Sequence, residues 1–338
     1  MNKLAMLFVS VLSVSACLGR LGHVTHINQI RDFYNETSRC LNLHHKGITA
    51  IDPIVFTQIS TDEQLKRVES IALQGNRLST LPETIGDLQN LRSLNLIFTG
   101  VEALPDRICD LQNLQNLYLY NNAIRVLPVN IGRLQNLRLL GLNGNNLNVL
   151  PESIGDLRNL QVLCLGYNQL ETLPDSIANL LNLRHLDLND NQFKKLPHAV
   201  CYLSNLEELN LAHNFLGNNP HEPLSIPLGI SSLGRLRVLN LSSNQFTKLM
   251  GRITCLSHLR ELDLSGNGLT TISHKIRRMQ GLWSLNLDHN HLYDISGVEG
   301  LRLGELHVVD NHLNDERFVG NWHRIRGLLR QDLVTIYE

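Results

Sequence analysis

The chain has 338 residues, of which 43% are hydrophobic, 5% are aromatic and 18% are charged. Its 30 Lys and Arg residues nearly balance its 31 Asp and Glu residues, so charge gives no argument for binding to nucleic acid. The length would allow two or three domains. A repeat that runs through most of the chain instead predicts one elongated domain with a cap at each end.

Residues 1–16 have the features of an export signal. Lys3 gives a basic start, and the apolar run at residues 4–14 is too short to span a membrane. The run leads into Val-Ser-Ala-Cys at residues 14–17, and small residues before a cysteine resemble the bacterial lipoprotein signal. That resemblance implies cleavage before Cys17 and lipidation of its thiol. Ordinary cleavage after Ala16 is one alternative, and an injected effector whose apolar start is incidental is another.

Residues 17–37 are expected to form the anchor, a linker and an N-terminal cap helix. Ile27, Ile30, Phe33 and Tyr34 recur at helical spacing, which is typical of a short amphipathic helix. This helix would cover the open end of the repeat core. Just beyond it, residues 40–43 look like a degenerate additional repeat.

One eleven-residue pattern recurs over residues 38–313. It has leucine-like residues at positions one, four, six and eleven, and asparagine at position nine. The pattern starts at Val68, Leu91, Leu114, Leu137, Leu160, Leu183, Leu206, Leu236, Leu259, Leu282 and Leu303. Its first six steps are 23 residues each, and a fixed period of this length indicates a solenoid. Positions four and six share one face of a short strand, so stacked repeats would bury a continuous leucine core.

The pattern resembles the leucine-rich-repeat family. One repeat fits the family signature with Leu114, Leu117, Leu119, Asn122 and Ile124. The segments at 81–88 and 150–157 share Leu-Pro followed by Ile-Gly-Asp-Leu, which is similar to the 23-residue type of Ras-group and bacterial members. The resemblance implies an α/β solenoid: a horseshoe of about 11–12 repeats with a parallel concave sheet, a buried asparagine ladder and helical caps at both ends. Thr99 replaces one of these asparagines, and we expect a looser turn there.

Two other segments depart from the repeat. Residues 217–223 are an insertion that should form a surface loop, either as tolerated drift or as a contact loop. Residues 314–338 should form a C-terminal cap, because apolar residues at helical spacing follow the last repeat. These apolar residues are Phe318, Trp322, Ile325, Leu328 and Leu329. Arginines interleave with them, so membrane binding of a basic amphipathic helix is the alternative.

No catalytic, cofactor or metal site is predicted. No Cys-x-x-Cys spacing occurs, and Cys109, Cys201 and Cys255 fall where the coil should bury free thiols. Unpaired thiols fit an oxidising compartment imperfectly, which favours an intracellular alternative. Histidines lie near carboxylates along the repeats, but the period itself produces that spacing. Cys164 has no adjacent residue in the pattern that could act as a base.

The free positions of the pattern should point to the concave face. In repeats two to five they are apolar or aromatic, and they would lie on adjacent strands about 5 Å apart. We call this set the apolar patch: Ile97, Phe98, Tyr118, Tyr120, Leu139, Val162 and Tyr167. Exposed apolar patches usually mark interaction sites, and Tyr is enriched in binding hot spots. The alternative is that some of these side chains shield the core.

The later repeats place carboxylates on the same face. We call this set the acidic stripe: Asp187, Asp190, Glu207, Glu208, Glu261, Asp263, Asp288, Glu305 and Asp310. Arg184, Arg237 and Arg260 are the arginines that oppose it there. Acidic and apolar surfaces side by side suggest a partner with a basic patch and an apolar anchor. Simple solvation of the face is the alternative.

Together these features predict a non-enzymatic interaction scaffold that binds a protein partner on its concave face. We expect a monomer without cofactors, exported and lipid-anchored to the bacterial envelope, whose membrane contact is the anchor alone. A translocated bacterial effector that binds a host protein or another effector is the alternative. A ubiquitin-ligase-type enzyme is a remote third possibility, because 25 residues follow Leu313 and such enzymes need a catalytic domain of a few hundred.

Overall fold

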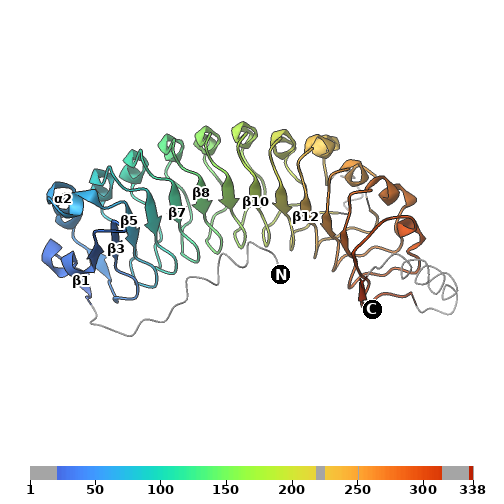
Figure 1. Ribbon diagram of the computed structural model, residues 1–338, viewed down its shortest axis with the longest axis horizontal. Helices are drawn as coiled ribbons and strands as arrows, with labels where there is room; N and C mark the ends of the chain where they lie inside the picture. Colours follow the sequence, from blue (N-terminus) through green and yellow to red (C-terminus); the bar gives the residue numbers. More distant parts are fainter. Residues whose placement is uncertain (1–20, 218–224, 250, 314–334, 338) are drawn as a thin grey trace.

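The computed structural model describes residues 21–217, 225–249, 251–313 and 335–337. The described chain curves into a long arc, with strands along its inner side and short helices along its outer side (Figure 1). The predicted solenoid with a parallel concave sheet is confirmed. Within the described residues, no helix is long and apolar enough to cross a membrane.

The concave sheet has 14 strands in the order β16-β15-β14-β13-β12-β11-β10-β9-β8-β7-β6-β5-β3-β2. Only β2 and β3 pair antiparallel, and every other neighbouring pair is parallel and in register. The strands are β2 Tyr34–Asn35, β3 Cys40–Asn42, β5 Ser70–Ala72, β6 Ser93–Asn95, β7 Asn116–Tyr118, β8 Leu139–Gly141, β9 Val162–Cys164, β10 His185–Asp187, β11 Glu208–Asn210, β12 Val238–Asn240, β13 Glu261–Asp263, β14 Ser284–Asn286, β15 Glu305–His307 and β16 Thr335–Tyr337. A separate two-stranded sheet pairs β1 His23–Val24 with β4 Ala50–Ile51.

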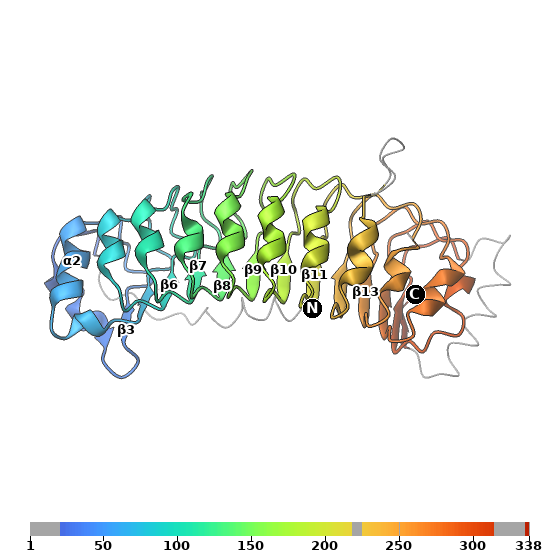
Figure 2. The same ribbon diagram turned by 90° about the horizontal axis from the view of Figure 1, so that it is seen from above.

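The outer side is a row of short helices packed side by side (Figure 2). They are α2 Pro53–Thr61 and the 3-10 helices η3 Leu65–Arg67, η4 Glu83–Asp87, η5 Asp106–Asp110, η6 Ile131–Arg133, η7 Glu152–Asp156, η8 Asp175–Asn179, η9 His198–Tyr202, η10 Leu228–Ser232, η11 Ile253–Cys255, η12 His274–Arg278 and η13 Ser296–Val298. Proline precedes many of them, as Pro151 precedes η7, because its fixed φ sets the entry to the turn. Glycine lets the coils approach closely. An added Cβ on Gly155 would lie 2.2 Å from the Ser176 carbonyl oxygen of the next coil.

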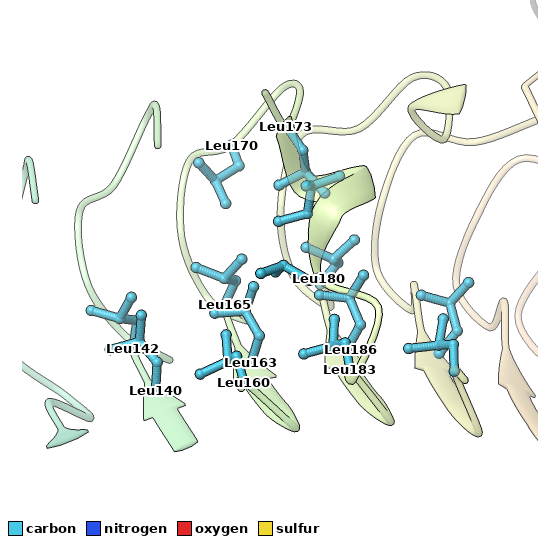
Figure 3. Close-up of a cluster of buried hydrophobic side chains, with 14 of the residues drawn as sticks. Leu140, Leu142, Leu160, Leu163, Leu165, Leu170, Leu173, Leu180, Leu183 and Leu186 are labelled. Carbon is cyan, nitrogen blue, oxygen red and sulfur yellow. The ribbon is translucent and has the colours of Figure 1, made fainter. Parts of the chain in front are cut away.

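The interior of the arc is a continuous stack of leucine side chains (Figure 3). Leu163 and Leu165 of one coil are fully buried, and Leu140 and Leu142 of the preceding coil are buried beside them. Each coil therefore completes the core of its neighbours, as the period predicts.

The predicted asparagine ladder is present. Asn168 is typical: its Nδ2 donates to the carbonyl oxygens of Leu142 and Leu165, both at 3.0 Å, and its Oδ1 accepts from the Leu147 N–H at 3.0 Å. These bonds satisfy buried backbone groups where the chain leaves the strand. The looser turn expected at Thr99 was wrong. Thr99 is buried, and its hydroxyl and N–H both donate to Asn122 Oδ1 of the next coil.

The N-terminal cap differs from the sequence prediction. The expected helix near residues 25–34 is two 3-10 turns, η1 Ile27–Gln29 and η2 Arg31–Phe33, and Ile27 and Ile30 are buried as expected. Strand β3 confirms the degenerate repeat, and α2 forms the first outer turn, N-capped by Asp52. The predicted helix within 314–338 lies outside the described residues, as do residues 1–16, Cys17 and most of the 217–223 insertion.

Candidate functional site

The concave face of β6 to β15 is the candidate binding surface. Strand register aligns equivalent free positions of successive repeats into columns across this face. One such column joins Tyr118, Gly141, Cys164 and Asp187. Neighbouring columns therefore bring the sequence-predicted residues of different repeats together, about 5 Å apart from strand to strand.

Phe98 and Tyr167 are the most exposed members of the apolar patch, at 62% and 60% exposure. Both also have a left-handed backbone, with φ of 53° each. Side chains with a Cβ adopt this conformation at a cost, and aromatic residues are unusual there. Other repeats have the same backbone at this position, as at Asn121, Asp190 and His289, with φ of 55°, 50° and 54°. The repeat therefore sets this conformation, and it is their exposure that distinguishes the two rings.

Tyr120 does not belong to the exposed surface, which corrects the prediction. It is only 7% exposed, and its ring lies over the backbone of Gly141, where an added Cβ would be 2.3 Å from Tyr120 Cζ. The hydroxyl donates to the sulfur of Cys164 at 3.6 Å, and burial raises the pKa of Tyr120. Because residue 141 is glycine, the ring can pack against the sheet. Tyr120 therefore stabilises the fold and is not available to contact a partner.

The remaining members of the apolar patch are half-buried. They are Ile97, Tyr118, Leu139 and Val162. Leu139 and Val162 are paired across β8 and β9. The rings of Tyr118 and Tyr120 lie 6.3 Å apart. The apolar patch therefore consists of two exposed rings and four half-buried side chains on the coils of β6 to β9.

Asp187 is the second correction, because this member of the acidic stripe is only 8% exposed. Its Oδ2 accepts from Asn143 Nδ2 at 2.9 Å, and its Oδ1 accepts from the Asn189 N–H at 3.2 Å. Burial raises the pKa of this carboxyl despite these hydrogen bonds. Asp190 stays half-exposed, accepts from Asn189 Nδ2 at 2.6 Å, and its charge raises the pKa of Tyr167.

The acidic stripe continues into a groove over β11 to β15. The groove is lined by Glu207, Glu208, Arg237, Val238, Leu239, Asn240, Arg260, Glu261, Leu262, Asp263, Ser284, Asn286, Glu305 and His307. Five carboxylates face two guanidinium groups in this lining. Glu208, Asp263 and Asp288 of the predicted stripe are half-buried. His185 Nδ1 lies 3.2 Å from Glu208 Oε2, without the geometry of a hydrogen bond.

The five cysteines that the structure describes form no disulfide, and three of them are buried. Burial raises the pKa of Cys109 and Cys201 to about 11 each and of Cys164 to about 12. Cys255 is exposed, against the prediction, because Thr254 takes the buried position in its turn. Among the described residues, no group of three His, Cys, Asp or Glu side chains could hold a metal ion.

One residue of this face was missed in the sequence. Trp283 is 51% exposed, and its ring lies over Gly304 of the next coil, where an added Cβ would be 2.1 Å from Trp283 Nε1. It occupies the second position of the pattern, beside Arg260 and the edge of the groove. The tryptophan followed in the next repeat by glycine was the available signal.

Family models match two stretches of the chain. One described as a leucine-rich repeat region matches residues 128–224, and one described as leucine rich repeat matches residues 234–292. These coils are leucine-rich repeats. Proteins built from such repeats are typically binding scaffolds without enzymatic activity, and their diversity of function lies in side chains outside the repeat pattern.

Solved leucine-rich-repeat structures match the whole arc. A leucine-rich-repeat protein of Leptospira interrogans is 27% identical, with a TM-score of 0.60 over 100% of this chain and 98% of that chain. An internalin of Listeria monocytogenes, 19% identical with a TM-score of 0.63 over 98% and 92% of the two chains, shows the fold alone. The plant peptide hormone receptor RGFR1 in complex with RGF2 is 25% identical, with a TM-score of 0.56 over 78% of this chain and 48% of that chain. No curated protein matches the chain in sequence.

Proposed function

We propose that this protein is a non-enzymatic scaffold that holds a protein partner on its concave face. The observation that carries the proposal is the pair Phe98 and Tyr167, two aromatic rings that are 62% and 60% exposed. Neither ring belongs to the leucine core, and the coils of β6 to β9 that carry them also carry the half-buried apolar side chains of Leu139 and Val162. Large rings at the centre of a partner interface supply much of its binding energy.

The partner should carry an apolar anchor and a basic patch. The apolar anchor would contact Phe98, Tyr167 and the half-buried members of the apolar patch. The basic patch would face the acidic stripe and groove over β11 to β15, where carboxylates outnumber guanidinium groups five to two. Complementary charge would speed the encounter and set orientation. The receptor RGFR1, which matches part of this arc, is itself in a complex with RGF2.

Site-specific photo-crosslinking tests this proposal and finds the partner. A photoreactive phenylalanine would replace Tyr167, and in a control it would replace Val129, which is 75% exposed near η6 on the outer side. In cells that make the protein natively, we expect a defined adduct from position 167 and none from position 129. Phe98→Ala should weaken the adduct. Adducts from position 129 alone would contradict binding on the concave face.

We further propose that residues 1–16 are removed on export. A lipid on Cys17 would then anchor residues 17–37 and the repeats to the envelope. Residues 314–338 would form the C-terminal cap. Several acyl chains hold a protein firmly where a single chain does not. Mass spectrometry of the mature N-terminus tests this: a diacylglyceryl Cys17 is the expected result.

The second candidate is a translocated effector with the same concave site. It is favoured by the free thiols at Cys40, Cys109, Cys164, Cys201 and Cys255, since unpaired cysteines are commoner in reducing compartments. An N-terminus that retains Met1 would favour this candidate over the lipoprotein. Cys17→Ser should release an anchored protein into the soluble exported fraction and leave an effector where it was.

A further inference from the structure

Three carboxylates in the groove form a regular row. Glu208, Glu261 and Glu305 occupy the same register position on β11, β13 and β15, and uncharged Val238 and Ser284 occupy it on β12 and β14. Neighbouring strands lie about 4.8 Å apart, so successive carboxylates of the row are roughly 9.6 Å apart along the arc. We call Glu208, Glu261 and Glu305 the glutamate row.

Two carboxylates of the row are open to a ligand, and the third, that of Glu208, lies 3.2 Å from His185 Nδ1 through its Oε2 atom. Glu261 is exposed, and within the described part of the chain its carboxylate has no hydrogen-bond or ion-pair partner. Glu305 Oε2 accepts from Ser284 Oγ at 3.2 Å, which leaves its other oxygen available. The groove around the row encloses about 750 Å³. A chain that crossed the strands here would meet one carboxylate on every second strand.

The spacing discriminates between conformations of that chain. A polyproline II segment rises about 3.1 Å per residue with three residues per turn, so every third side chain returns to the same edge after about 9.3 Å. Side chains on one face of a β-strand repeat after about 6.7 Å. Residues seven apart on an α-helix lie about 10.5 Å apart, and this distance exceeds the spacing of the carboxylates in the row at each step. The polyproline II repeat fits the row best.

We infer that the groove binds a cationic segment of another protein in polyproline II conformation, with Lys or Arg at every third residue facing the glutamate row. This inference rests on the proposed function and specifies the basic patch of the partner. The excess of carboxylates over guanidinium groups in the groove lining provides the complementary charge.

Trp283 supplies an apolar contact for the same segment. Its exposed indole lies over Gly304, immediately before Glu305 in the chain, and so borders the row between β13 and β15. Aromatic side chains along a groove are the usual contacts for the ring faces of polyproline II segments. The lysines would therefore contact the glutamate row while an intervening apolar residue packs on Trp283.

Two synthetic peptides of identical composition test the inference. One repeats Lys-Pro-Pro three times; the other places its three lysines together before six prolines. Fluorescence anisotropy at low salt should show the repeating peptide binding about fivefold more tightly, because only its charges match the row. The triple variant E208Q/E261Q/E305Q should abolish this difference. The matched control E152Q/D156N/D175N, which removes three exposed outer-side carboxylates, should preserve it.

Trp283→Ala should weaken the repeating peptide about threefold at both low and high salt, since the lost contact is apolar. Equal binding of the two peptides to the wild type, or equal losses in the row variant and the control variant, would overturn the inference. Phe98→Ala with Tyr167→Ala should leave peptide binding unchanged. Failure of the peptide test with crosslinking at position 167 intact would remove this inference and leave the proposed function standing.

Discussion

The two halves of the concave face share one scaffold and differ in chemistry. Over β6 to β9 the free positions carry the exposed rings of Phe98 and Tyr167 and the half-buried members of the apolar patch. Over β11 to β15 they carry the carboxylates of a polar groove. The buried leucines and the asparagine ladder beneath are the same in both halves. The repeat therefore fixes where a side chain points, and the chain can vary its chemistry there without disturbing the core.

Two buried side chains on the concave face show where this freedom ends. Tyr120 and Asp187 occupy free positions of the pattern, yet both are buried. Tyr120 reaches Cys164, and Asp187 accepts a hydrogen bond from Asn143; each contact spans 44 residues, or two coils. Side chains that pack along the sheet in this way connect coils that are two repeats apart, and we expect them to stabilise the fold.

The largest effect is expected from the core that both halves share. Leu163→Ala in β9 and Leu262→Ala in β13 each remove a buried side chain, and each should lower the free energy of unfolding by about 2–5 kcal/mol. Denaturant titration followed by circular dichroism measures this. A loss in only one half would show that the two cores are not equivalent, and an unmoved midpoint would contradict the burial of that leucine.

The next prediction compares the stability contribution of a buried aromatic residue, Tyr120, with that of an exposed one, Phe98. Tyr120→Ala should lower the free energy of unfolding by about 2–3 kcal/mol, because a buried ring and its hydrogen bond are lost. Phe98→Ala should change it by less than about 0.5 kcal/mol, since the ring is solvent-exposed. Thermal unfolding of the two variants makes the comparison. Equal losses would mean that Phe98 also supports the fold, which would weaken its assignment to binding.

The smallest expected effect is the pH dependence of stability that comes from Asp187 in β10. Burial raises the pKa of Asp187, so the folded chain holds this proton more tightly than the unfolded chain. The stabilising contribution is therefore complete below the ordinary aspartate pKa of about 3.9 and is lost as pH rises through the raised folded value. Asp187→Asn should remove this dependence. Its single amide oxygen can accept from Asn143 or from the Asn189 N–H but not from both, so the variant loses one hydrogen bond at every pH.

Unfolding titrations of wild type and Asp187→Asn between pH 3 and pH 7 provide the measurement. The difference between the two curves should shift in favour of the variant as pH rises. Parallel curves would mean that the Asp187 carboxyl titrates equally in the folded and unfolded chains.

The architecture could be predicted from the sequence because the repeat period determines which side chains are buried in every coil. A leucine such as Leu163 recurs every 23 residues, so its burial follows from the pattern alone. The exposure of Phe98 and Tyr167 follows equally from their positions. The burial of Tyr120 could not be read in the same way, since it depends on a glycine one coil away at residue 141. Helix α2 was missed although Asp52 followed by proline is a recognisable N-cap signal.

The glutamate row could also be read from the repeat. Glu208, Glu261 and Glu305 are each the third residue of the pattern, which starts at Leu206, Leu259 and Leu303. The 53 residues between Glu208 and Glu261 exceed two periods of 23 because the 217–223 insertion intervenes. Strand register confirms that the three glutamates lie on alternate strands.

Titration calorimetry of the crosslinked partner, purified and titrated at low and high salt, tests the division of the concave face most directly. We predict that Phe98→Ala with Tyr167→Ala costs about 2–4 kcal/mol of affinity at both salt concentrations. The variant E208Q/E261Q/E305Q should lose affinity at low salt and little at high salt, because salt screens exposed charges. Unchanged affinity in the aromatic variant, or a loss of the same size in a Val129→Ala control, would contradict the account.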